Sequence, residues 1–373
     1  MNIEQEVSTN HKTPIQSLDD SSVPQPMPRR SFLRRLGVGA ALLAPGAAFL
    51  GQARAATAEV DGVATALPAG DVALLRFLAA AELIETDLWQ QYTELALGNP
   101  AYEAALGQLD EDMGQYISDN TDDELSHANF LNAFLQSRGE SPVNLDAFRT
   151  LPSSQATGAQ QIGRLTNLTN LTVDTSFWIR YRSPVNPDFE NAAAFPQFIE
   201  IVNFPAIPSQ DLPMGSPRLQ AIANTAAFHF CTIEQGGTSL YASLVRKASR
   251  ERVVKIIAGI GGSEVNHFAI WHDKAGNAPA VTVPGVSFPD MKDFEGDKLR
   301  QKNLIMPEPC EFISADLPLC SIVRPTTFRK AGATAAVHAL RMSGLFSGQS
   351  QNFFRLLSSL ARAADAAERD SNA

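Results

Sequence analysis

Cysteine is scarce in this sequence. The 373 residues contain only Cys231, Cys310 and Cys320, and no Cys-x-x-Cys motif is present. A cysteine-bound structural zinc site or an iron–sulfur cluster is therefore not expected. Cys310 and Cys320 could close a small disulfide loop or stay as two thiols, and the spacing does not decide between them.

Positive charge is also in short supply. The chain has 30 Lys and Arg residues against 40 Asp and Glu residues, which gives a formal net charge of −10. Since an acidic protein without a long basic stripe repels phosphates, nucleic acid is not expected as a partner. The 44% of hydrophobic and 19% of charged residues predict a folded, globular chain.

The apolar run near the N-terminus, "GVGAALLAPGAAFLG", is too short for a membrane span, which needs about 20 residues. It follows the basic stretch "RRSFLRRLG" and precedes "ARA", so residues 1–55 are expected to be an export signal cleaved before Ala56. The segment resembles a twin-arginine signal with the pair Arg29 and Arg30. That resemblance implies a folded passage through the twin-arginine translocase, a periplasmic or extracellular location, and no stable membrane span after cleavage.

Helical spacing of apolar residues organises the rest of the chain. After a spacer (56–70), helices are predicted at 71–97, 101–138, 216–248 and 250–274, which together form a bundle over 71–276. The second of these contains a capping box, Thr121 with Glu124, so it either bends there or a new helix begins there.

Two segments depart from this pattern. Residues 140–215 are rich in Pro, Asn, Thr and aromatics and are predicted to be a long crossover with a surface insertion. The C-terminal part, 277–373, is expected to contain a Pro-rich segment to residue 325 and then a final helical stretch, about 326–369, that packs on the bundle. The large aromatics of the bundle are expected in its core, namely Trp89, Phe130, Phe228, Phe230 and Trp271.

Two short stretches, "DELSHANF" and "SEVNHFAI", each place a glutamate three residues before a histidine. On a helix, Glu124 with His127 and Glu264 with His267 would each lie on one face, one turn apart. Carboxylate oxygen and imidazole nitrogen together suit iron, manganese or zinc. The two pairs therefore predict a metal site shared by two helices.

The other two helices each carry a glutamate followed seven residues later by a tyrosine: Glu85 with Tyr92, and Glu234 with Tyr241. Seven residues are nearly two turns, so each tyrosine shares a face with its glutamate. The order Glu, Tyr, Glu-x-x-His thus occurs twice. Glu82 competes with Glu85 as the ligand of the first helix, but Cys231 is its counterpart in the repeat, so the repeat favours Glu85.

Four helices that each supply a carboxylate, two of them with a histidine three residues on, resemble the ferritin-like superfamily of di-metal bundles. The similarity covers about residues 71–275 and is closest to exported ferritin-like proteins of the desiccation-related type. It implies an all-α four-helix bundle with terminal ligands Glu85 and Glu234, bridging carboxylates Glu124 and Glu264, and nitrogen ligands His127 and His267.

The resemblance also assigns residues around the ligands. Tyr92 and Tyr241 resemble tyrosines that donate hydrogen bonds to ligand carboxylates in rubrerythrin-like proteins. In bacterioferritin-like proteins the Asp before each Glu-x-x-His holds the opposite histidine, which here makes Asp123 the partner of His267. Ser263 stands at the second such position. His127 is therefore expected to be held less firmly.

Two functions from different classes follow. The first is an exported protein with two iron ions, or manganese ions as a variant, that reacts with dioxygen or peroxide as an oxidase, peroxidase or ferroxidase. The second is a stress-protective structural protein in which a metal site is structural or vestigial. Glycines near the proposed ligands, such as Gly237 and Gly262, allow three functional explanations, namely close helix approach, a π-type distortion or access for a small oxidant, and one purely structural explanation, simple fraying of the helices.

Overall fold

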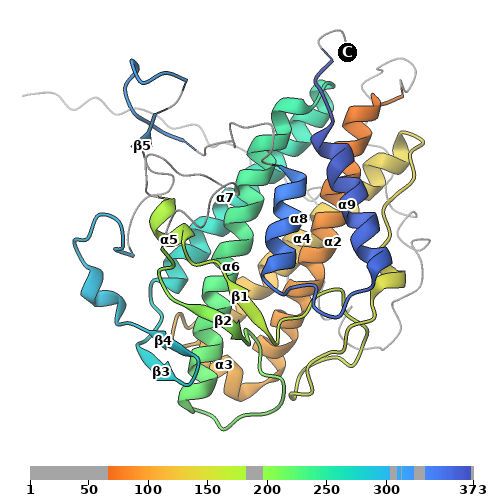
Figure 1. Ribbon diagram of the computed structural model, residues 1–373. Helices are drawn as coiled ribbons and strands as arrows, with labels where there is room; N and C mark the ends of the chain where they lie inside the picture. The colour runs from red at the N-terminus through yellow and green to blue at the C-terminus, as the bar shows by residue number, and fades with distance from the viewer. Residues whose placement is uncertain (1–65, 182–195, 303–308, 312, 323–331, 371–373) are drawn as a thin grey trace, which may run out of the picture. The chain divides into compact units, whose positions relative to one another are not determined.

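The computed structural model describes residues 66–181, 196–302, 309–311, 313–322 and 332–370. Its centre consists of four long helices: α2 (Ala69–Gly98), α4 (Met113–Ser137), α6 (Pro217–Leu244) and α7 (Glu251–Ala275). Helix α2 packs against α4 and helix α6 against α7 (Figure 1). The predicted all-α bundle is confirmed. The expected signal (1–55), with Arg29 and Arg30, lies outside the described residues.

Local sequence explains where these helices begin and end. Helix α2 ends at Asn99, whose side chain accepts a hydrogen bond from the backbone N–H of Tyr102 and so starts the short helix α3 (Pro100–Leu106). Helix α6 begins with Ser216 as its cap and Pro217 in its first turn. The helix break expected near Thr121 is wrong: the chain breaks at 107–112, and Thr121 lies inside α4, where its hydroxyl donates to the carbonyl oxygen of Ile117.

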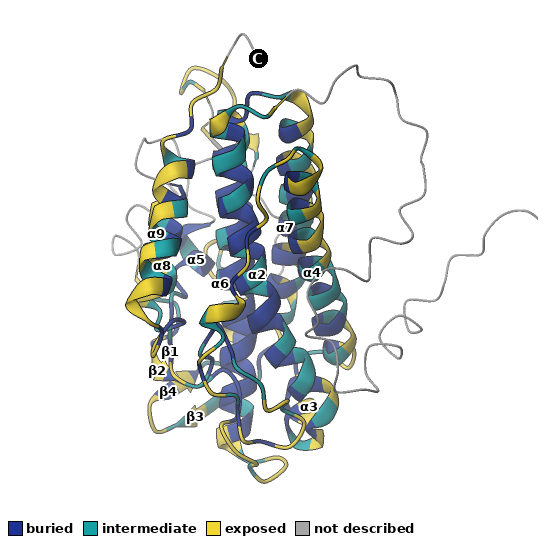
Figure 2. Ribbon diagram, turned by 90° about the vertical axis from the view of Figure 1, so that its right-hand side faces the viewer, coloured by how far each residue is buried: buried dark blue, intermediate teal, exposed yellow. Residues whose placement is uncertain are grey.

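The four helices differ in how much of their surface is buried. Helices α2 and α6 are buried on nearly all sides, whereas α4 and α7 each keep one exposed face (Figure 2). Trp89, Phe228, Phe230 and Trp271 lie in the core as expected. Phe130 does not: it lies on the outer face of α4 and is 53% exposed.

The crossover between α4 and α6 forms a layer beside the bundle. It contains a 3₁₀ turn (Asp146–Phe148), β1 (Leu171–Val173), α5 (Phe177–Arg180) and β2 (Ile201–Phe204), and β1 pairs with β2 in antiparallel fashion. Buried Asp87 of α2 holds the crossover in place, since its carboxylate accepts hydrogen bonds from the backbone N–H groups of Leu165 and Thr166. Arg149 also contacts Asp87, with 2.6 Å between Nη1 and Oδ1. The layer covers one side of α6 (Figure 1).

The C-terminal part begins with two small hairpins. Strand β3 (Val281–Val283) pairs with β4 (Val286–Phe288), and β5 (Pro309–Cys310) pairs with β6 (Cys320–Ser321). A 3₁₀ turn, Met291–Phe294, lies between the hairpins. Cys310 and Cys320 are directly opposite in this ladder, and Cys320 is a free, exposed thiol.

Two helices follow, α8 (Ala333–Met342) and α9 (Gln351–Asp365), where one helical stretch was expected. The reason is local: Gly344 and Gly348 adopt positive φ values, which an α-helix does not accommodate. Helix α9 packs on α2 and helix α8 on α9 and α6, in agreement with the expected packing role. Within the described ranges, no helix is both long and apolar enough to cross a membrane.

Candidate metal centre

Two groups of potential ligands meet between the four helices. The first comprises Glu82 of α2, Glu124 and His127 of α4, and Glu264 of α7; the second comprises Glu124, Glu234 of α6, Glu264 and His267. Within each group, one ligand atom per residue lies within 4.8 Å of the others. Glu124 and Glu264 belong to both groups, so the two groups form one continuous cluster with two shared carboxylates.

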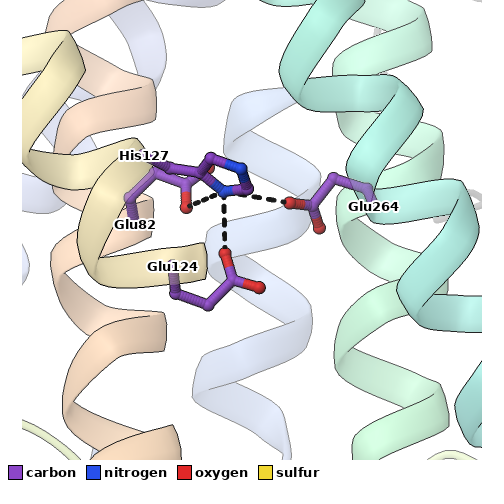
Figure 3. A group of neighbouring side chains, drawn as sticks. All are labelled: Glu82, Glu124, His127 and Glu264. Atoms are coloured by element: carbon purple, nitrogen blue, oxygen red, sulfur yellow. Dashed lines mark hydrogen bonds and ion pairs between the residues drawn. The ribbon is translucent and has the colours of Figure 1, made fainter. Parts of the chain in front are cut away.

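In the first group, the carboxylates surround one imidazole nitrogen. His127 Nδ1 lies 3.0 Å from Glu124 Oε2, 3.3 Å from Glu82 Oε2 and 3.7 Å from Glu264 Oε1. Figure 3 shows these side chains pointing toward one another from three helices. The three carboxylates are completely or almost completely buried.

The second group repeats the arrangement around His267. Its Nδ1 lies 3.0 Å from Glu124 Oε1 and 3.3 Å from Glu234 Oε2. Glu124 thus directs one oxygen toward each histidine. The expected convergence of Glu124, His127, Glu234, Glu264 and His267 is present.

Glu85 is not among these ligands, and the preference for it over Glu82 was wrong. Glu82 has the same place in the first group that Glu234 has in the second. When α2 and α6 are aligned on this pair, the residue of α6 that corresponds to Glu85 is Gly237. The spacing of seven residues to an aromatic misled the prediction, because Glu82 is itself seven residues before Trp89, just as Glu234 is seven before Tyr241.

The same alignment means that Tyr92 and Tyr241 do not occupy corresponding positions, and their hydroxyl groups have different hydrogen-bond partners. The Tyr241 hydroxyl donates a short hydrogen bond to Glu82 Oε1, which is the contact to a ligand carboxylate that was expected of it. Tyr92 makes no such contact. Its hydroxyl lies 2.8 Å from His229 Nδ1, and His229 belongs to neither group of potential ligands. The role expected for Tyr92 was therefore wrong.

Polar side chains beside the histidines hold only one of them. Asp123 Oδ2 lies 3.2 Å from His267 Nε2, the expected contact, and Ser263 Oγ lies 3.4 Å from the same nitrogen. No side chain within the described part of the chain contacts His127 Nε2 in this way. His127 is therefore held less firmly, as expected.

Asn120 is a contributor that the sequence analysis missed. Its amide nitrogen donates to Glu124 Oε1 at 2.8 Å and to Glu234 Oε1 at 3.1 Å, and its oxygen accepts from Trp271 Nε1. Asn120 therefore fixes two carboxylates from two helices. Its place four residues before Glu124, on the same face of α4, was a signal that could have identified it.

Without metal, the buried carboxylates resist ionisation. Burial raises the pKa of Glu82 to about 7 against the opposing effect of neighbouring His127. Burial and then repulsion by Glu82, Glu124 and Glu234 raise the pKa of Glu85 well above its usual value. Burial, followed by repulsion from Glu124, raises the pKa of Glu264 in the same way. The cluster therefore requires positive charge.

In the absence of ions, the histidines supply that charge. Burial opposes imidazolium formation, but the neighbouring carboxylates of Glu124 and Glu82 raise the pKa of His127 to about 10. Carboxylates raise the pKa of His267 further still, against the effect of burial. Burial alone would raise the pKa of Glu124, yet its interactions with the two neighbouring histidines lower it to about 2. Metal ions would compete with these protons.

Several potential ligand atoms lack hydrogen-bond partners, which is the strongest indication that a cation fits. His267 Nδ1 lies only 3.0 Å from a carboxylate oxygen, but the angles do not form a hydrogen bond. Buried polar atoms without a partner are rare and cost about 1–3 kcal/mol each. These unpaired atoms sit on both groups: Glu82 Oε2, Glu234 Oε2, Glu264 Oε1 and Oε2, and His267 Nδ1. The residues present fit a pair of cations.

The glycines beside the cluster allow close approach, the first of the three functional explanations considered. A Cβ atom at Gly237 would lie 2.1 Å from Glu264 Oε2, and one at Gly261 would lie 2.8 Å from Tyr241 Cβ. Helices α6 and α7 are regular α-helices at these points, so no π-type distortion is present in them. Gly259 and Gly262 face open space.

The comparison with protein families agrees with this geometry. The model of the ferritin-like domain family matches residues 70–277, more than half of the chain and the whole of the four-helix bundle. The chain therefore belongs to the ferritin-like domain family. Curated proteins and solved structures gave no match.

Proposed function

We propose that this protein binds two iron ions and reacts with dioxygen or hydrogen peroxide as an exported oxidoreductase. Glu82 and His127 would be the terminal ligands of one ion, and Glu234 and His267 those of the other. Glu124 and Glu264 would bridge the pair. The observation that carries the proposal is the sharing of these two carboxylates by both groups of potential ligands.

The charges of the cluster favour two divalent ions. Four ligand carboxylates carry four negative charges, which two such ions balance. Oxygen and nitrogen donors of this kind suit iron and manganese. Bound iron would exchange electrons with the oxidant.

The surrounding residues keep the ligands in place. Asp123 accepts a hydrogen bond from the N–H group at His267 Nε2, which leaves the lone pair of Nδ1 directed into the cluster. Asn120 orients Glu124 and Glu234, and Tyr241 orients Glu82. Glu85 is a fifth carboxyl group beside the cluster, and burial followed by repulsion from neighbouring carboxylates raises its pKa.

Export is part of the proposal and rests on the sequence alone. Replacement of both Arg29 and Arg30 by Lys is expected to stop translocation by the twin-arginine pathway. Cell fractionation would then find the uncleaved chain in the cytoplasm. Unchanged export of the variant would argue against this pathway and leave the metal site untouched.

The experiment that tests the function compares the native protein with a Glu124→Ala, Glu264→Ala double variant. Iron and manganese are counted per chain, and the reduced proteins are then mixed with dioxygen or peroxide while optical spectra are recorded. The native protein is expected to contain two iron ions and to oxidise them, and the double variant is expected to contain none.

Glu103→Ala is a matched control, because Glu103 is an exposed carboxylate on α3. It should retain both ions. A native protein that binds two ions but reacts with neither oxidant would assign the metals a structural role. Absence of metal from the native protein would overturn the proposal.

A further inference from the structure

A cavity of about 140 Å³ lies beside the metal cluster. Its walls come from α2, α6, α8, α9 and the crossover layer, and none of its lining residues belongs to α4 or α7. Apolar side chains make up most of the wall, among them Phe77, Ile84, Leu240, Val337 and Leu357. The cavity therefore lies on the side of the bundle that the C-terminal helices cover.

Its size limits what it can hold. An engineered cavity of about 150 Å³ lined by Leu, Ile and Phe stays dry and binds benzene. A cavity of about 140 Å³ thus has room for one six-membered ring. Larger organic molecules would not fit without movement of α8.

His229 gives the cavity an unused polar group. It lines the cavity, and its side chain is only 1% exposed. Nδ1 is occupied by the Tyr92 hydroxyl, while Nε2 is buried and has no hydrogen-bond partner. If Tyr92 donates to Nδ1, the proton of the neutral imidazole is on Nε2, and this arrangement satisfies both groups best. An oxygen atom of a ligand would complete it.

Glu85 adds a second polar group to the same wall. Within the described residues its carboxyl group has no hydrogen-bond or ion-pair partner, although it lies close enough to Glu82, Glu124 and Glu234 to feel their charge. Glu85 is thus in contact with the cavity and electrostatically coupled to the metal cluster. It is the residue through which a ligand would be sensed at the cluster.

The backbone around Gly237 separates the cavity from the cluster. Gly236 and Gly237 both line the cavity, and the Cβ position of Gly237 is 2.1 Å from Glu264 Oε2. No side chain can stand there without moving the bridging carboxylate. Bare backbone is therefore all that lies between a ligand at this point and Glu264.

Helix α8 provides the entrance. Ala336 and Val337 are buried in the cavity wall, whereas Ala339, which also lines it, is exposed. A small molecule could therefore enter from solvent along α8. The C-terminal extension thus completes the cavity.

We infer that this cavity is a binding site for a small, largely apolar ring compound with one oxygen acceptor, such as a phenol, held against His229 and Glu85 beside the metal cluster. Recognition combines burial of the ring with a hydrogen bond from His229 Nε2 to the oxygen. Binding needs no metal, so this inference stands or falls separately from the proposed redox function.

The test compares phenol with toluene, which has the same shape without the oxygen. Binding of each compound to the full-length, zinc-loaded protein and to the metal-free protein is measured by titration calorimetry. Phenol is expected to bind about tenfold or more tightly than toluene, a ratio that corresponds to 1.4 kcal/mol. In the His229→Phe variant this preference should disappear while toluene binding remains.

Variants of α8 establish where the compounds bind. Ala336→Phe fills the cavity and is expected to weaken binding of both compounds by about tenfold or more, because the ring loses its space. Ala335→Phe adds the same side chain to the same helix at a position that does not line the cavity, and should change nothing. Val337→Phe is a second filling variant in case Ala336→Phe does not fold.

Three results would overturn the inference: no binding of phenol or toluene, equal affinity for both compounds in the native protein, or equal losses in Ala336→Phe and Ala335→Phe. Each can occur whether or not the protein binds iron. A protein that binds two iron ions but does not bind phenol would support the proposed function and contradict only the inference about the cavity.

Discussion

The two halves of the bundle supply equivalent ligands in unequal surroundings. Glu82, Glu124 and His127 of the first half correspond to Glu234, Glu264 and His267 of the second. The residues around them differ between the halves. Trp89 of the first half occupies the position that Tyr241 occupies in the second, and Glu85 occupies the position of Gly237. The ligand set is symmetric, and its environment is not.

Because of this difference, the two groups of potential ligands are not interchangeable. Asp123 holds His267, but among the residues that the structure describes no equivalent side chain holds His127. The cavity also lies on one side of the cluster of potential ligands, and both Gly237 and Glu85 line it. The potential ligands repeat between the two halves, but the residues around them do not. These unequal surroundings can make one bound ion bind or react differently from the other.

The largest expected effect comes from the contact between the halves at Gly237. In Gly237→Ala the new Cβ would displace the carboxylate end of Glu264, which is flexible, so the fold should survive while both ions lose a bridging ligand. Loss of an outer contact alone costs about 10–100-fold in metal affinity, so a displaced ligand should cost about 100-fold or more. Metal titration measures this loss.

Gly262→Ala is the control for that variant. A Cβ at Gly262 meets nothing within 4 Å, so metal affinity should stay the same and the helix should gain about 1 kcal/mol of stability. Thermal unfolding of both variants separates the effect on the fold from the effect on the site. Full metal binding by Gly237→Ala would show that the close approach is unimportant.

A smaller effect, confined to one ion, distinguishes Glu82 from Glu85. Glu82→Gln removes a terminal ligand of one ion, so this variant should retain one ion per chain at limiting metal concentration. Glu85→Gln should retain two, because Glu85 is not in either group of potential ligands. The reverse result would mean that the correspondence between α2 and α6 described above is incorrect.

The unequal contacts of the two histidines predict a still smaller effect on metal affinity. Asp123→Ala leaves His267 Nε2 without its carboxylate partner and is expected to weaken one of the two ions by about 10–100-fold. Ser263→Ala should have a smaller effect because its contact is longer, at 3.4 Å. Competition with a chelator would measure both affinities. Equal effects of the two variants would contradict the assigned role of Asp123.

The smallest effect concerns His229, whose counterpart in the other half is Phe77. Burial lowers the pKa of His229 to about 3 from 6.5, so the neutral form stabilises the fold above pH 6.5. That contribution is lost as the pH falls from 6.5 toward 3, with a slope of at most about 1.4 kcal/mol per pH unit. Denaturant unfolding of the native protein and of His229→Gln should show that the difference between them changes only below about pH 6.5. A constant difference down to pH 4 would contradict the lowered pKa.

Much of the bundle and five of the six residues in the cluster of potential ligands could be predicted from the sequence. Apolar spacing fixed the four long helices, and Glu-x-x-His on two of them identified Glu124, His127, Glu264 and His267 with little dependence on tertiary detail. The resemblance to bacterioferritin-like proteins suggested the contact of Asp123, the residue before Glu124, with His267. These features depend on positions along one helix.

What the sequence could not provide was the axial alignment of α2 with α6. Glu82 and Glu85 lie only about 60° apart on α2, so both face the interior, and the choice between them depends on packing. Tyr92 was misassigned for the same reason. The cavity was also inaccessible to sequence analysis, because its wall combines residues of α2 and α8 that lie more than 200 positions apart, together with residues of α6.

The most direct test of the central claim is a crystal structure of the protein grown with iron, with anomalous scattering recorded at the iron edge. The account predicts two peaks, one near Glu82 and His127 and the other near Glu234 and His267, with Glu124 and Glu264 in contact with both. A single peak, no peak, or a peak ligated by Glu85 in place of Glu82 would contradict it.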